Sequence, residues 1–109
     1  MMENKIMEEM KEKLIKHFLD IIILFELKNS NCLSGYDILA FLHNRFGLLI
    51  SSGTVYSLLY SLERKGMIEG SFGEGKRIYS LTDQGTKTIN AVSRSKEGIL
   101  KFMQTLFII

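Results

Sequence analysis

The spacing of hydrophobic residues along the chain predicts a mainly helical protein. Residues 3–28 contain neither glycine nor proline and predict one long N-terminal helix. Its first half is charged and amphipathic, whereas its second half is apolar nearly all round and should be buried on several sides. A second helix is predicted over 35–46, because Ser34 is a suitable N-cap and Gly47 a suitable C-terminal cap. Its buried stripe comprises Ile38, Leu39 and Leu42.

A third helix is predicted from Ser51 or Ser52 to Lys65, and its faces differ in chemistry. The apolar stripe has the i, i+3, i+4, i+7 spacing of Val55, Leu58, Leu59 and Leu62. The other faces carry hydroxyls, phenols and a guanidinium, which are groups that bind phosphates and base edges. They belong to Thr54, Tyr56, Ser57, Tyr60, Ser61 and Arg64. A merely solvated helix face is the alternative, but such a face favours Glu and Lys.

After this helix the pattern changes to that of strands. Residues 67–71 and 76–81 alternate, and the glycine-rich segment 72–75 between them is a turn signal, so we expect a β-hairpin. We call this hairpin the wing. Two short helices joined by a turn are the minimal helix-turn-helix, and a hairpin directly after them makes it a winged one.

A last helix is predicted from Thr82 or Asp83 to about Leu106. Such a helix spans about 36 Å and would overhang a domain this small. Its apolar stripe therefore needs a second chain to cover it. The residues predicted at this dimer surface are Ile89, Val92, Ile99, Met103, Leu106 and Phe107.

The length of 109 residues favours one domain. We expect it to consist of an N-terminal helix (1–28), the helix-turn-helix with its wing (34–82) and a C-terminal dimerisation helix (83–109). The predicted fold class is therefore mainly α with a small β-hairpin, a winged helix-turn-helix with long terminal helices.

Charge and cysteine content narrow the function only slightly. The net charge of +2 is too small to indicate nucleic acid by itself, although a dimer could present a basic face built from residues 84–109. The single cysteine, Cys32, cannot form an internal disulfide or a zinc cluster, and a semi-buried, inert thiol is favoured over a redox sensor. The charged N-terminus lacks a signal-peptide pattern, and the apolar run 18–25 is too short to span a bilayer. We expect a cytoplasmic protein without a membrane partner.

The sequence offers no catalytic constellation. His17 and His43 lie on different predicted helices, without a matched acid or nucleophile. The glycines of 70–75 superficially resemble a phosphate loop, but they lead into a strand, whereas a phosphate loop leads into a helix. We therefore expect no enzyme, no metal and no cofactor.

Short motifs follow one another in order between residues 35 and 85. They are Gly35-Tyr36-Asp37-Ile38, Gly53-Thr54-Val55-Tyr56, Leu59 with Leu62, Gly66-Met67-Ile68, and Tyr79-Ser80-Leu81-Thr82 with Gly85. Together they resemble the PadR family of winged-helix transcriptional regulators, in its short branch with a single C-terminal helix. The chain departs from the family pattern at Ser57, where proline is frequent, and in the short basic stretch of its wing.

The resemblance implies a homodimeric, sequence-specific DNA-binding regulator, most often a repressor, on a palindromic operator. The third helix would enter the major groove. Phosphates would be held by Ser51, Ser52, Thr54, Tyr56 and Tyr60, and base edges would lie nearer Ser57, Ser61 and Arg64. On the wing, Lys76 and Arg77 would approach the backbone or the minor groove.

The sequence leaves two further partners undecided, a small-molecule effector and another protein. The family resemblance leaves room for a small-molecule effector, which the sequence does not identify. The alternative to a DNA-binding regulator is a protein-interaction module, in which the winged helix has lost DNA and the last helix docks another protein.

Overall fold

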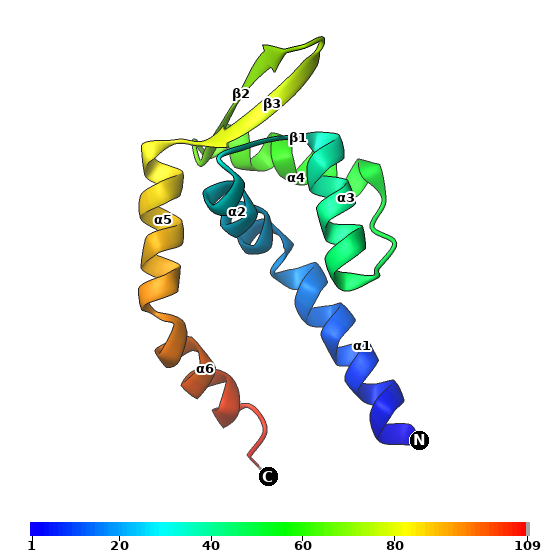
Figure 1. The fold of residues 1–109 in the computed structure, drawn as a ribbon. Coiled ribbons are helices and arrows are strands. Elements are labelled where there is room, and N and C mark those ends of the chain that lie inside the picture. The colour runs from blue at the N-terminus through cyan, green and yellow to red at the C-terminus, as the bar shows by residue number, and fades with distance from the viewer. Residues whose placement is uncertain (109) are drawn as a thin grey trace.

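The computed structural model describes residues 1–108, which form six helices and a three-stranded sheet. In chain order the elements are α1 (Met2–His17), α2 (Leu19–Ser30), β1 (Cys32–Ser34), α3 (Gly35–Phe46), α4 (Ser52–Arg64), β2 (Ile68–Gly73), β3 (Lys76–Leu81), α5 (Asp83–Arg94) and α6 (Lys96–Thr105) (Figure 1). The predicted mainly helical architecture with a β-hairpin is confirmed. No helix among these residues is both long and apolar enough to cross a membrane.

The N-terminal segment forms two helices, so the single helix predicted over 3–28 is wrong. The backbone leaves helical geometry at Phe18 (φ −104°, ψ 16°). Burial changes at the same point, because α1 contributes no buried residue, whereas α2 buries four leucine and isoleucine side chains. The Phe18 amide still donates to the Leu14 carbonyl at 2.9 Å, so α2 follows α1 without a loop.

The C-terminal segment is also divided, which corrects the prediction of one helix to about Leu106. Helical geometry is interrupted at Ser95 (φ −92°, ψ 2°), between α5 and α6. Again the break separates a packed helix from an exposed one, because α5 packs against α2 and α6 buries no residue. The part of the C-terminal segment that overhangs the core is therefore α6.

The caps of the two central helices are confirmed. The Ser34 hydroxyl accepts from the Asp37 amide at 3.1 Å, and the Asp37 carboxylate accepts from the Ser34 amide at 3.0 Å. The hydrogen bond from the Ser34 amide, followed by the Ser34 hydroxyl, lowers the pKa of the Asp37 carboxyl. At the other end of α3, Gly47 adopts a left-handed conformation (φ 67°). Helix α4 begins after Ser51, whose hydroxyl accepts from the Thr54 amide at 3.1 Å.

The sheet contains a strand that the sequence did not reveal. Strand β1 pairs antiparallel with β3, which pairs with β2, so β3 is central. Cys32 lies in β1 and is exposed, which corrects the expected semi-buried position. The wing turn is also tighter than predicted. Only Glu74 and Gly75 lie outside the strands, and both have positive φ (54° and 77°), as a two-residue hairpin turn with the native strand twist requires.

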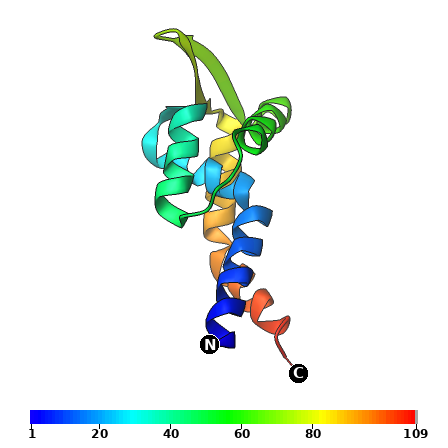
Figure 2. The same cartoon turned by 90° about the vertical axis from the view of Figure 1, so that its right-hand side faces the viewer.

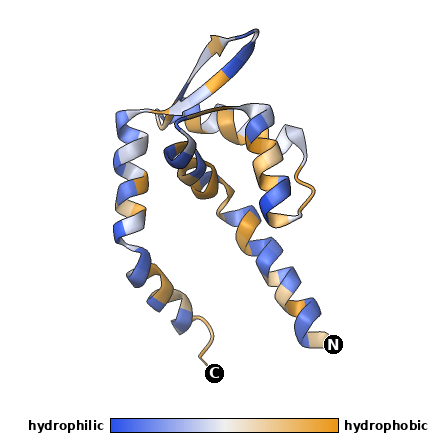
Figure 3. Ribbon diagram, viewed as in Figure 1, coloured by the Kyte–Doolittle hydropathy of each residue, from blue (hydrophilic) through white to orange (hydrophobic). Residues whose placement is uncertain are grey.

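The core is built around α2. It contains Leu19, Ile23, Leu24 and Leu27 of α2, Ile38 and Leu42 of α3, Val55, Leu59 and Leu62 of α4, Ile68 and Tyr79 of the wing and Ile89 of α5. Figure 3 shows the hydrophobic residues running along α2, whereas α1 mixes both kinds. Leu39 and Leu58 are only partly buried at the margin of this core. The wing projects at one end of the molecule, and both chain ends lie at the other (Figure 2).

Candidate nucleic-acid interface

Helix α4 presents its polar face to solvent, beside the wing. Its apolar stripe turns inward, with Val55, Leu59 and Leu62 buried, so the helical period turns the polar residues outward. The side chains of Tyr56 and Tyr60 are 47% and 64% exposed. The Arg64 guanidinium lies 5.6 Å from the centre of the Tyr60 ring, which places a cation and a phenol together on this face. Ser61 is half-buried and contributes less surface.

A close backbone approach positions Tyr56. A Cβ atom added at Gly35 would lie 2.7 Å from both Cζ and Oη of Tyr56, so only glycine lets the ring lie over the first turn of α3. The glycine of the Gly35-Tyr36 motif thus fixes a side chain of α4. This contact links the two helices of the helix-turn-helix at the exposed surface.

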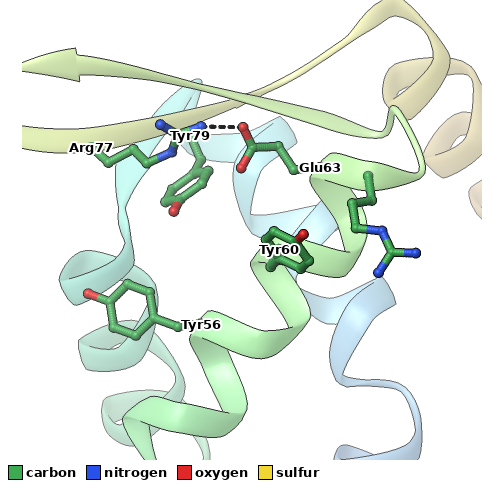
Figure 4. Close-up of a pocket in the computed structure, with 6 residues that line it drawn as sticks. Tyr56, Tyr60, Glu63, Arg77 and Tyr79 are labelled. Carbon is green, nitrogen blue, oxygen red and sulfur yellow. Dashed lines mark hydrogen bonds and ion pairs between the residues drawn. The ribbon is translucent and has the colours of Figure 1, made fainter.

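Two hollows flank α4. The first, of about 580 Å³, lies between α4 and the wing, and Figure 4 shows the side chains that line it. These are Tyr56, Tyr60, Glu63, Arg64, Arg77 and Tyr79. The second, of about 870 Å³, lies on the other side of α4, where Ser51, Thr54 and Ser57 face Lys16 of α1. Helix α4 is therefore a ridge, and the residues predicted to bind DNA divide between its two flanks.

The start of α4 holds the hydroxyls predicted to bind phosphate. The Ser51 and Thr54 hydroxyl oxygens lie 2.8 Å apart and share a hydrogen bond, while Ser52 lies exposed in the first turn. Amide groups at a helix N-terminus together with such hydroxyls favour an anion. This end of α4 can therefore receive a phosphate oxygen on the flank that Ser57 shares.

The two basic residues of the wing lie on opposite faces of the hairpin. Successive strand residues alternate, and Arg77 pairs across the strands with Phe72, whereas Lys76 pairs with Gly73. The Arg77 side chain turns toward α4 and donates to the Glu63 carboxylate (Figure 4). That hydrogen bond and the charge of Glu63 raise the pKa of Arg77. Lys76 lies on the other face, where its charge contributes to the lowered pKa of Asp37.

Glu63 is a residue of this surface that sequence reasoning missed. It lies three and seven residues after Tyr60 and Tyr56, so the helical period could have placed it on their side of α4. Strand alternation could likewise have placed Arg77 and Tyr79 on one face. The pairing of the two elements depends on how the wing folds back, and no local pattern reveals that.

The residues predicted at the dimer surface differ in exposure. Ile89 is fully buried in the core of its own chain, so it is unavailable to a partner and the prediction for it is wrong. Val92 is partly buried against the same core. Ile99, Leu106 and Phe107 are exposed, and Met103 is half-buried. Ile108, in the apolar end of the chain, is exposed as well, and so are Leu100 and Phe102, which were not predicted.

The family model of the transcriptional regulator PadR-like family matches residues 23–91, which include α3, α4 and the wing. The chain belongs to this family. PadR-like proteins are transcriptional regulators, so the chain is not an enzyme. No cluster of three or more His, Cys, Asp or Glu side chains within 1–108 could hold a metal ion.

Solved structures agree with the family. A transcriptional regulator from Clostridium thermocellum is 25% identical with a TM-score of 0.74, over 88% of this chain and 96% of its own. A PadR family regulator from Eggerthella lenta is 24% identical with a TM-score of 0.73, over 97% and 96%. PadR from Bacillus subtilis, solved in complex with operator DNA, is 26% identical with a TM-score of 0.56, over 67% and 45%. Among curated proteins, none matches the sequence significantly. These PadR-like neighbours establish the winged-helix fold.

Proposed function

We propose that this PadR-like protein is a sequence-specific DNA-binding repressor that acts as a cytoplasmic homodimer on a palindromic operator. The observation that carries the proposal is the exposed ridge of α4, with its tyrosines, hydroxyls and arginine beside the wing. The similar Bacillus subtilis PadR was solved in complex with operator DNA, which supports DNA as the partner.

In this proposal α4 lies in the major groove. Ser57, Ser61 and Arg64 are the residues nearest to base edges, and the hydroxyls of Ser51, Ser52 and Thr54 hold a phosphate at the start of the helix. Tyr56 and Tyr60 contact the sugar-phosphate backbone on the flank that faces the wing. Lys76, near the tip of the wing, reaches a phosphate farther along the duplex.

The proposed dimer forms at the end of the molecule away from the wing. There α6 exposes Ile99, the residues after it expose Leu106 and Phe107, and α1 exposes Ile6 and Leu14. Together these side chains would leave a large apolar surface in water. A pair of chains joined at this end would present two α4 helices. Two half-sites about 34–36 Å apart, one turn of DNA, would fit such a symmetric pair.

Selection of binding sites from a pool of random duplexes tests the proposal with the full chain. We expect a palindromic site, and fluorescence anisotropy should show at least about a thousandfold preference for it over a scrambled duplex. The logarithm of the binding constant should fall linearly with the logarithm of salt concentration, because bound cations leave the phosphates.

The alternative is a protein-interaction module without DNA binding. Two observations favour this module: the net charge is only +2, and Glu63 neutralises Arg77. Both make the surface less basic than is usual for a protein that binds DNA. The same titration separates the two. If the protein binds no duplex at low salt, the interaction module replaces the DNA-binding regulator as the proposed function.

A further inference from the structure

The Arg77 side chain extends toward α4 between Phe72 and Tyr79 and over Gly70, and we call this path its channel. Its guanidinium carbon lies 5.9 Å from the centre of the Phe72 ring and 5.8 Å from that of Tyr79, so two aromatic rings flank it on the inner face of the wing. A Cβ atom at Gly70 would fall 2.5 Å from the Arg77 Nε and 2.9 Å from its Cζ. The guanidinium therefore passes over Gly70, where any other side chain would obstruct it.

The channel ends at Glu63. The Arg77 Nη2 group donates to the Glu63 carboxylate, while the two side chains remain 42% and 26% exposed. A guanidinium has five N–H donors, so one edge of Arg77 can hold Glu63 while others stay available to a phosphate. The pair also joins the wing to α4, since its two members belong to β3 and α4.

A carboxylate on a surface that meets DNA has a cost. It repels the phosphates of any duplex. A charge of either sign at this point therefore changes the affinity for every duplex alike, unless another contact makes the change depend on the duplex. The selective element here is the fixed position of Arg77. When held by Glu63, the guanidinium can meet a phosphate at one place only, whereas a released arginine could reach any nearby phosphate.

We propose that Glu63 is a positioning residue that sets DNA specificity by holding Arg77 in this channel. This inference rests on the proposed DNA-binding function. In this proposal Glu63 weakens binding to random DNA. Arg77 contacts a phosphate only on a duplex that fits both α4 and the wing. Gly70 contributes to the same effect, because its missing side chain leaves room for the Arg77 guanidinium.

The test compares the selected site with a scrambled duplex in anisotropy titrations at several salt concentrations. Glu63→Gln should raise affinity for the scrambled duplex about threefold and steepen its salt slope by about one unit, as one more free cation does. Affinity for the selected site should not rise, so the ratio of the two affinities should fall at least about threefold by the same reasoning.

Glu69→Gln is the matched control. Glu69 is an exposed carboxylate on the outer face of the same hairpin, so this variant removes the same charge without touching Arg77. It should change both affinities alike. Gly70→Ala provides the converse variant, because it keeps every charge but displaces the guanidinium, and it should lower the ratio as Glu63→Gln does. Thermal unfolding checks that each variant remains folded.

The Arg77→Ala background identifies the route of the effect. If Glu63 acts through Arg77, adding Glu63→Gln to Arg77→Ala should leave the ratio unchanged. The proposal is overturned if Glu63→Gln behaves like Glu69→Gln, if its effect on the ratio persists without Arg77, or if Gly70→Ala keeps the full ratio. A wild-type protein that binds no duplex would instead overturn the proposed function itself.

Discussion

At the scale of single residues, the surface beside the wing depends on positions where a side chain is missing. Gly35 makes room for the Tyr56 ring and Gly70 for the Arg77 guanidinium, and both neighbours are flexible side chains from another element. A methyl group at either site would displace a side chain of the proposed DNA-binding surface more readily than it would disrupt the core. Family motifs that contain such glycines can therefore preserve the geometry of a surface as well as a turn.

We expect Gly35→Ala to weaken DNA binding with little change in stability. The added methyl group would collide with the Tyr56 ring, which must then swing away from the first turn of α3. Loss of one phosphate contact should reduce affinity for selected and scrambled duplexes alike, by about threefold. Gly98→Ala is the control, because nothing lies near that position in α6. Equal affinities for the two variants would show that Tyr56 does not need this position.

Asp37 should make stability depend on pH in the acid range. Hydrogen bonds with Ser34 lower its pKa from the ordinary 3.8, so the folded state favours the carboxylate. Its contribution is then fully present above pH 3.8 and is lost as the pH falls through the lower pKa of the folded state. Asp37→Asn should lower the unfolding temperature at pH 7, and the difference from wild type should shrink below that range. A constant difference down to pH 2.5 would contradict this assignment.

At the scale of elements, local patterns predicted what local chemistry determines. Ser34, Gly47 and Ser51 mark helix ends through hydrogen bonds within a few residues, and the sequence located them correctly. The breaks at Phe18 and Ser95 carry no glycine or proline, and they arise where a helix leaves the core. Strand β1 has only three residues and owes its form to the distant pairing of Leu33 with Tyr79. The link between Glu63 and Arg77 has the same long-range origin.

The two faces of the wing should be separable by mutation. Lys76→Ala removes an exposed cation that has no ion-pair partner within 1–108, so it should weaken both duplexes alike and reduce the salt slope by about one unit. Arg77→Ala removes a cation that Glu63 already compensates, and it should weaken the selected site more than the scrambled one. Titrations of the two single variants on both duplexes measure this. Identical losses would mean that the wing acts as one undivided basic patch.

At the scale of the whole molecule, the two ends have different chemistry. The end with the wing carries tyrosines and arginines over a packed core, and the other end carries α1 and α6, neither of which buries a residue. A helix whose apolar side chains face water gains little from folding alone, because helix formation itself contributes little stability. We therefore propose that the two terminal helices are stabilised by a partner chain, and that two partnered chains bind DNA as one unit.

The strongest test of this proposal is a pair of charges placed directly after α6. Leu106→Lys with Phe107→Lys should leave the chain's own core intact, because both side chains are exposed, but should prevent their burial against a second copy. Burying such side chains stabilises by about 1.5–3 kcal/mol each, so the dimer should weaken more than about a hundredfold. Sedimentation should show a micromolar dimer for the wild type and for Gln104→Lys, an exposed polar position near the end of α6, and a monomer for the double variant. The monomer should also lose most of its preference for a palindrome, since each half-site would then be bound separately. A folded wild-type monomer at micromolar concentration would rule out the dimer and, with it, the proposed spacing of half-sites.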